Sequence, residues 1–232
     1  MKRIGIIGAM EEEVNIIKGL MQDVTINTIA SMDFCEGKLK EKEVIVVRCG
    51  IGKVNAAICT QILADRYQVE AVINTGVAGS LRNEIDIADI VLSTDALQHD
   101  MDATGFGYGL GVIPRMEQSI FVADERLVSL AKKVCQNVIP EVGVHIGRVV
   151  SGDQFISDGD KKSWLVENFQ GYCTEMEGAA IAQAAYLNQL PFLIIRAISD
   201  KADQSAEMAY SEFEELAISH TVKLLQDMIA EI

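Results

Sequence analysis

The stretch FLIIRAISD, residues 192–200, decides how this chain is expected to fold. It opens with four consecutive apolar residues, which is typical of a strand that is buried on both faces of a sheet. Arg196 follows this apolar run directly, and Asp200 comes four residues later. Because charged residues are common where a strand meets solvent, the pair could simply mark the end of the strand. Choosing between that interpretation and a function requires the rest of the chain.

Similar short β-rich runs alternate with helical patterns along the whole sequence. The expected strands are RIGIIGA (3–9), EVIVVRCG (43–50), AVINTG (71–76), DIVLST (89–94), GVHIGRVVSG (143–152) and FLIIRAIS (192–199). The expected helices are 11–21, 53–67, 124–138 with Asp124 as N-cap, 177–190, and a last helix opening with the capping box Ser211-x-x-Glu214. This alternation predicts an α/β layered fold, and no linker-like tract divides the chain. We therefore expect a single domain over residues 1–232.

Composition and charge narrow the class of protein. The formal net charge of −14 gives no general attraction for nucleic acid or for an anionic membrane surface. Five scattered cysteines, mostly in apolar runs, fit reduced thiols better than a disulfide framework. The apolar start at residues 4–10 is stopped by Glu11 and is interpreted as a strand rather than a signal peptide. No apolar run approaches the roughly 20 residues that span a bilayer, so a soluble cytoplasmic protein is expected.

Glycines gather where the expected strands end, at Gly8, Gly50, Gly52, Gly76, Gly79 and Gly152. Ligands of open α/β sheets bind beyond the carboxyl ends of the strands, so this grouping favours a ligand site over ordinary turns. The segment GIIGAMEEE (5–13) has neither the dinucleotide-binding nor the P-loop spacing. Its three acids, Glu11-Glu12-Glu13, could stabilise the first turn of a helix, or one of them could face the site as a general base.

Three further segments contain candidate polar or aromatic site residues. Phe155 in VSGDQFI (150–156) is either a core residue or a surface on which a planar base stacks. In TEMEGAAIA (174–182), Glu175 and Glu177 share one face if the segment is extended, where they would need donors such as an arginine or a ribose diol. Alternatively, both stand at a helix N-terminus. HDMD (99–102) lacks metal-ligand spacing and is interpreted as a solvated loop.

Six segments together resemble one known family. They are IGIIGAMEEEV (4–14), CGIGKVNAA (49–57), INTGVAGSL (73–81), VVSGDQFI (149–156), TEMEGAAIA (174–182) and IIRAISDKAD (194–203). In order and approximate spacing they resemble the bacterial 5′-methylthioadenosine/S-adenosylhomocysteine nucleosidases of the nucleoside phosphorylase/hydrolase superfamily. The resemblance implies a three-layer α/β/α fold around a mixed, largely parallel sheet. It also implies a homodimer that needs no cofactor or metal and hydrolyses the N-glycosidic bond of these small nucleosides to release adenine.

The resemblance further implies roles for the ionisable residues. Asp200 would be the general acid that protonates the leaving adenine, which requires burial to raise its pKa above the usual value of about 3.9. Glu13 would activate the attacking water, with Glu175 and Arg196 in support. Glu177, oriented by Arg196, would accept hydrogen bonds from the sugar hydroxyls and stabilise a cationic transition state.

Other positions implied by the resemblance would surround the nucleoside. Phe155 would stack on adenine, and the backbone of Ile156 would read the edge of the base. The remaining substrate-binding residues would be Met10, Ile51, Ala78, Gly79, Met176, Ser199 and Tyr210. Ala103, Phe106 and Pro114 would reach into the site of the partner subunit.

Two departures from the family pattern bear on substrate preference. Val77 replaces the serine of the family's T-G-S-A-G turn, and Tyr210 stands where phenylalanine is usual. Three alternatives stay open: a hydrolase of another adenine nucleoside such as 5′-deoxyadenosine or aminofutalosine, a phosphate-dependent phosphorylase, and a nucleoside-binding module without catalysis. A phosphorylase needs arginines near the first glycine turn, where this chain has three glutamates, so water is the expected nucleophile.

Overall fold

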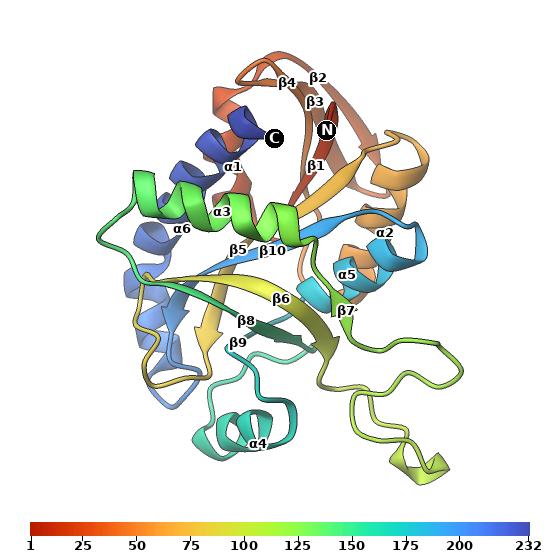
Figure 1. The fold of residues 1–232 in the computed structure, drawn as a ribbon, viewed down its shortest axis with the longest axis vertical. Helices are drawn as coiled ribbons and strands as arrows, with labels where there is room; N and C mark the ends of the chain where they lie inside the picture. The colour runs from red at the N-terminus through yellow and green to blue at the C-terminus, as the bar shows by residue number, and fades with distance from the viewer.

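A ten-stranded mixed sheet runs through the computed structural model, which describes the backbone of residues 1–232 and all side chains except those of 207–212 (Figure 1). Its strands are β1 (Arg3–Gly8), β2 (Gln22–Ile29), β3 (Met32–Leu39), β4 (Lys42–Arg48), β5 (Ala71–Ser80), β6 (Ile90–Gln98), β7 (Phe121–Val122), β8 (Val144–Ser151), β9 (Cys173–Glu175) and β10 (Phe192–Asp200). The helices are α1 (Glu11–Leu20), α2 (Lys53–Asp65), the short 3-10 helix η1 (Thr104–Phe106), α3 (Glu125–Val138), α4 (Gly159–Phe169), α5 (Gly178–Leu187) and α6 (Ala206–Glu231). The expected α/β fold is confirmed.

Helices cover both faces of the sheet. Figure 1 shows α1, α3 and α6 on one side and α2 and α5 on the other. Successive side chains of a strand point to opposite faces of the sheet, so one strand packs against both helix layers. Ile4 and Ile6 of β1 belong to the apolar cluster under the first group of helices, and Ile7 belongs to the cluster under the second. All three isoleucines are fully buried. This explains why the predicted strands are continuously apolar instead of alternating with polar residues.

Part of the sheet closes on itself. Strand β5 lies parallel to β1 on one edge and to β10 on the other, and β10 is followed in turn by β6, β8 and β9. The three-residue strand β9 then pairs back onto β5, with Gly79 opposite Thr174. The closure brings the carboxyl ends of β5 and β10 next to the end of β9. The sequence did not predict it, because the pairing depends on strands too short to leave a periodic signal.

Further features differ from the sequence-based expectation, among them helix α4, which was not predicted. The hairpin of β2 and β3 was not predicted, because its turn at Ala30 and Ser31 has positive φ at both residues without the Asn-Gly pair that usually marks such a turn. The last helix begins at Ala206, so the predicted start at Ser211 is wrong. The N-cap Asp124 is confirmed, since its carboxylate accepts from the amides of Arg126 and Leu127. Among the described residues, no helix is both long and apolar enough to cross a membrane.

Candidate active site

A pocket of about 330 Å³ lies where the ends of β1, β5, β9 and β10 converge. It is lined by Ala9, Met10, Glu13, Ile51, Val77, Ala78, Gly79, Phe155, Thr174, Glu175, Met176, Glu177, Ser199 and Asp200. The residues come from segments far apart in the sequence and meet only because the strands end at one place. This is the position at which α/β sheets usually bind ligands.

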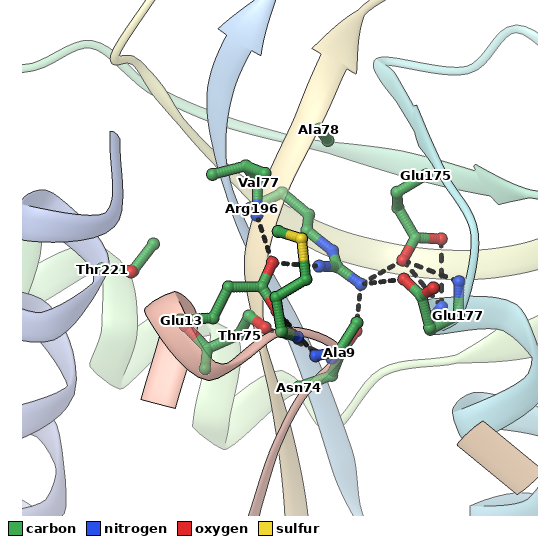
Figure 2. Close-up of polar contacts among 12 residues, drawn as sticks. Ala9, Glu13, Asn74, Thr75, Val77, Ala78, Glu175, Glu177, Arg196 and Thr221 are labelled. Carbon is green, nitrogen blue, oxygen red and sulfur yellow. Dashed lines mark hydrogen bonds and ion pairs between the residues drawn. The ribbon is translucent and has the colours of Figure 1, made fainter. Parts of the chain in front are cut away.

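Arg196 lies behind the pocket wall and connects its carboxylates. It projects from the middle of β10 and is 1% exposed. Its Nη2 donates to Glu175 and, at 2.7 Å, to Oδ1 of Asn74, and it lies 3.7 Å from Oε2 of Glu177. Its Nη1 is 4.0 Å from Oε1 of Glu13. Figure 2 shows the guanidinium between Glu13 on one side and Glu175 and Glu177 on the other, so one buried cation faces three buried carboxylates.

The close approach of Arg196 and Glu13 depends on Gly76. Its φ is +158°, and a Cβ at this position would lie 2.1 Å from Nη1 of Arg196 and 2.3 Å from Oε1 of Glu13. Any side chain would therefore occupy the space that the ion pair needs. The glycine that follows AVINT inside β5 is explained by this packing against the carboxylate cluster.

Glu13 is the one acid of the Glu11-Glu12-Glu13 run that faces the pocket. Its Oε2 accepts from the amides of Ala9 (2.6 Å) and Met10 (3.0 Å), and its Oε1 accepts from the amide of Val77 (3.2 Å). Burial raises the pKa of Glu13, although Arg196 and these amides act in the opposite direction. A carboxylate with a raised pKa, held at the rim of a cavity, is suited to take a proton from water.

Glu177 is the N-cap of α5, as the helix-terminus interpretation proposed, whereas Glu175 is the last residue of β9 and only its carboxylate reaches the helix start. The carboxylate of Glu175 accepts from the amide of Gly178 at 2.8 Å, from the amide of Glu177 at 3.2 Å and from the hydroxyl of Ser151. Glu177 nevertheless reaches the pocket, where its Oε1 accepts from the amide of Gly52 at 2.8 Å. Burial, reinforced by the charge of Glu175, raises the pKa of Glu177 to about 7, with Arg196 and the Gly52 amide acting against the shift.

The raised pKa of Glu177 gives a prediction about stability. The folded protein holds this proton more tightly than the unfolded chain, so the contribution of Glu177 is fully present below about pH 4.5 and is lost as the pH rises through about 7. We expect Glu177→Gln to be more stable than the unchanged protein at pH 8, by roughly 1–3 kcal/mol, and to lose this advantage towards pH 4. Urea unfolding at both pH values measures it. An equal difference at the two pH values would contradict the prediction.

Asp200 lines the pocket at the end of β10. Its Oδ1 accepts from the amide of Ala202 at 2.7 Å, and the hydroxyl of Ser199 donates to Oδ2 at 2.8 Å. Burial raises the pKa of Asp200 against these two hydrogen bonds, as the sequence-based interpretation required. A Cβ at Gly79 would lie 2.7 Å from Oδ1, so the small residue at that position makes room for the carboxylate.

Most of the predicted site residues line this one pocket, and six do not lie on its described wall, one of which is Arg196 behind it. Ile156 is buried in a separate apolar cluster beside the site. Ala103 lies directly before η1, Phe106 at its end and Pro114 beyond it, in the segment that extends away from the sheet in Figure 1. The side chain of Tyr210 lies outside the described residues.

Several residues around the site were not predicted. Ala9 and Thr174 line the pocket, Val77 had been noted only as a departure from the family turn, and Asn74 and Ser151 bond to Arg196 and Glu175. Asn74 did leave a signal, because an amide inside the apolar run AVINTG must find a buried partner. Among the described residues, no group of three or more His, Cys, Asp or Glu side chains is arranged to hold a metal ion.

Comparison with known proteins gives consistent matches over the whole chain. The family model described as the phosphorylase superfamily matches residues 3–230. A protein from Exiguobacterium sp. named 5′-methylthioadenosine/S-adenosylhomocysteine nucleosidase is 42% identical over 224 residues, covering 96% of this chain and 95% of the relative. A nucleosidase of the same name from Neisseria meningitidis, in complex with methylthio-immucillin-A, is 33% identical with a TM-score of 0.96 and full coverage of both chains. A futalosine hydrolase mutant from Helicobacter pylori is also 33% identical, with a TM-score of 0.94 and full coverage of both.

Proposed function

The chain belongs to the phosphorylase superfamily and, within it, to the 5′-methylthioadenosine/S-adenosylhomocysteine nucleosidases, and we propose how its pocket hydrolyses the N-glycosidic bond of these nucleosides. The products are adenine and the thio-substituted ribose. The observation that carries the proposed mechanism is the grouping of Glu13, Glu177 and Asp200, three acids with raised pKa values, on the wall of one pocket. Pure binding of a neutral nucleoside would not require all three.

Asp200 is the proposed general acid. When the bond between C1′ and the purine breaks, both bonding electrons leave with the base, and the sugar becomes cationic. A proton from Asp200 to a nitrogen of the five-membered ring of the purine neutralises the departing base. The raised pKa of Asp200 supports this role, because the carboxyl group must carry a proton near neutral pH.

Glu13 and Glu177 act on the sugar side of the same step. A water held by Glu13 attacks C1′ and gives its proton to the carboxylate, which completes the hydrolysis. Glu177 accepts hydrogen bonds from the ribose hydroxyls, with its position set by Arg196 and the Gly52 amide. Three carboxylates around one guanidinium leave an excess of negative charge, and a cationic sugar is the species that such a site stabilises most.

The charge of the pocket favours water over phosphate as the nucleophile. The described residues that line it include no lysine or arginine, and the nearest cation, Arg196, is already shared by carboxylates. A phosphate dianion placed beside Glu13 would meet like charge without a free cationic partner.

The function is tested by adenine release from a panel of nucleosides. We expect adenine release from 5′-methylthioadenosine and S-adenosylhomocysteine, with 5′-deoxyadenosine and aminofutalosine as comparison substrates. The released adenine is measured by chromatography. The likeness to the futalosine hydrolase mutant makes aminofutalosine the second candidate substrate. Turnover of aminofutalosine alone would replace the first substrate assignment with the second. No adenine from any of the four would contradict the proposed function.

We also propose a homodimer in which the segment around η1 completes the partner's pocket. Support comes from exposed apolar side chains: Phe106 in the η1 segment is 88% exposed, and Ile51, which lines the pocket, is 55% exposed and is followed at helical spacing by Val54 and Ile58 of α2, which are 71% and 41% exposed. Clustered exposure of this kind is typical of an interaction surface. Sedimentation velocity should give twice the 25.3 kDa mass of the chain, and a lone monomer at micromolar concentration would contradict the proposal.

A cytoplasmic location and a single domain over residues 1–232 complete the proposal. All five cysteines are free and buried, which suits a reducing compartment. One sheet includes strands from both ends of the chain, from β1 to β10, which supports one folding unit. Cell fractionation and the coincidence of unfolding transitions measured by two probes test the two statements.

A further inference from the structure

Lys53, Asp100 and Asp153 form a closed ring of contacts beside the pocket, which we name the Lys53 cluster. The Nζ of Lys53 donates to Oδ1 of Asp100 at 2.6 Å, and the amide of Asp153 donates to Oδ2 of Asp100 at 3.0 Å. The amide of Lys53, at the N-terminus of α2, donates to Oδ1 of Asp153 at 2.9 Å. Each member therefore bonds to the other two. The interpretation of residues 99–102 as a solvated loop is wrong for His99, which is buried, and for Asp100, which is half-buried.

The cluster joins two segments that line the pocket. On one side, Gly52 precedes Lys53 and donates its amide to Oε1 of Glu177, while Ile51 lines the pocket. On the other side, Asp153 stands two residues before Phe155, which also lines the pocket. The two segments lie about 100 positions apart in the sequence, and Lys53 and Asp153 bond directly to each other.

The local backbone supports this as a specific arrangement. Gly52 has a φ of +98°, and a Cβ there would lie 3.1 Å from Oδ1 of Asp153. A residue with a side chain would be strained and would press on the contact between the two segments. Lys53 Nζ also donates to Oε1 of Gln98 at 2.9 Å, so the ammonium group is held by the last residue of β6 and by Asp100 just beyond that strand.

An ordinary surface ion pair would hold the two segments together only weakly, because such pairs contribute about 0–1 kcal/mol to the stability of the folded protein. The pair here differs in that the side chains of Lys53 and Asp100 are only 18% and 17% exposed. Burial raises the pKa of Asp100, but the hydrogen bonds from Lys53 and from the Asp153 amide outweigh it and lower the pKa below the usual value. The carboxylate is thus ionised and fully engaged by donors in the folded protein.

We propose that the Lys53 cluster is a positioning device that sets the Gly52 amide, and through it Glu177, at a fixed separation from the segment bearing Phe155. It thereby couples the ribose part of the pocket to the adenine part, although none of its three members lines the pocket. The proposal rests on the proposed function, since it assigns Glu177 to the ribose and Phe155 to the base. The contacts of Glu177 with the ribose and of Phe155 with the base act on the bound nucleoside before and during the reaction. Weakening them by disturbing the cluster should therefore appear mainly in KM.

The test compares Asp100→Asn and Lys53→Met with Lys53→Arg, which keeps the cation. For 5′-methylthioadenosine we expect KM to rise about tenfold in the first two variants, with kcat changed less than about threefold and a smaller KM effect in Lys53→Arg. Adenine binding by titration calorimetry should weaken by a similar factor. A merely structural role would instead reduce the active fraction, which lowers kcat and the melting temperature while KM stays unchanged.

Asp95→Asn is the matched control. Oδ1 of Asp95 lies 2.6 Å from Nε of Arg148, the side chains are 16% and 27% exposed, and neither residue lines the pocket. A KM for Asp100→Asn within twofold of that for Asp95→Asn would overturn the inference. If the unchanged protein binds adenine without hydrolysing the nucleoside, the proposed function fails alone and adenine affinity still decides the role of the cluster. If the unchanged protein does not bind adenine, both proposals fail.

Discussion

Asp200→Asn should lower kcat for 5′-methylthioadenosine by about 10³-fold while changing KM much less. Asparagine keeps the shape of the side chain and can still accept from the Ala202 amide, but it has no acidic proton to give to the leaving base. Loss of a general acid costs about 10²–10⁴-fold, and the poor leaving group places this reaction within that range. Adenine release at saturating nucleoside measures the effect.

The control for this variant is Asp203→Asn. Asp203 lies three residues further along the chain, outside the pocket, and its carboxylate accepts from Ser205 instead of facing the cavity. Both variants replace an acidic side chain by its amide in the same region, so a general effect of the substitution would appear in both. An Asp200→Asn enzyme with kcat within tenfold of the unchanged protein would remove Asp200 from the mechanism.

The second large effect is expected for Glu13→Gln, which should reduce kcat by about 10³-fold or more. The amide is a far weaker base than the carboxylate and would turn an NH₂ group either towards the amide donors of Ala9 and Met10 or towards that of Val77. The nucleophilic water would then lose both its proton acceptor and its fixed position. Initial rates across pH 5–9 measure the loss, which should persist at every pH.

Glu12→Gln is the matched control, since Glu12 is the adjacent acid of the same helical turn and is exposed. It removes the same charge from the first turn of α1 without reaching the pocket. Equal rates for the two variants would mean that Glu13 acts only through the general field of the helix start. A melting temperature for each variant separates loss of chemistry from loss of folded protein.

The central strands could be predicted because a strand that is buried on both faces of the sheet must be apolar at nearly every position, and such a run is easily recognised in the sequence. The apolar runs of β1 and β10 have no other stable location than the middle of a layered fold. Strand β2 is exposed along nearly its whole length, so no apolar pattern marks it. Strand β9, with three residues, closes part of the sheet through pairings that only the assembled fold supplies.

The candidate site could be predicted as a set of residues but not as an arrangement. Three consecutive acids at Glu11 to Glu13 differ only in their position around the helix, and the register that turns Glu13 inward is set by packing against β1 and β5. Arg196 was expected to orient Glu177, and it does form an ion pair with Glu177 at 3.7 Å, but its additional hydrogen bond to Glu175 depends on the assembled fold. The partners of Asp100 could not be inferred, because Lys53 and Asp153 are distant in sequence and carry no shared pattern.

The measurement that tests the central claim most directly is a crystal structure of Asp200→Asn with 5′-methylthioadenosine. The mechanism predicts an intact nucleoside in the pocket, with adenine against Phe155 and its five-membered ring facing residue 200. The ribose hydroxyls should donate hydrogen bonds to Glu177, and a water should lie between Glu13 and C1′. A nucleoside whose C1′ faces away from Glu13, or whose ribose does not contact Glu177, would contradict the assignment of these carboxylates to the hydrolysis.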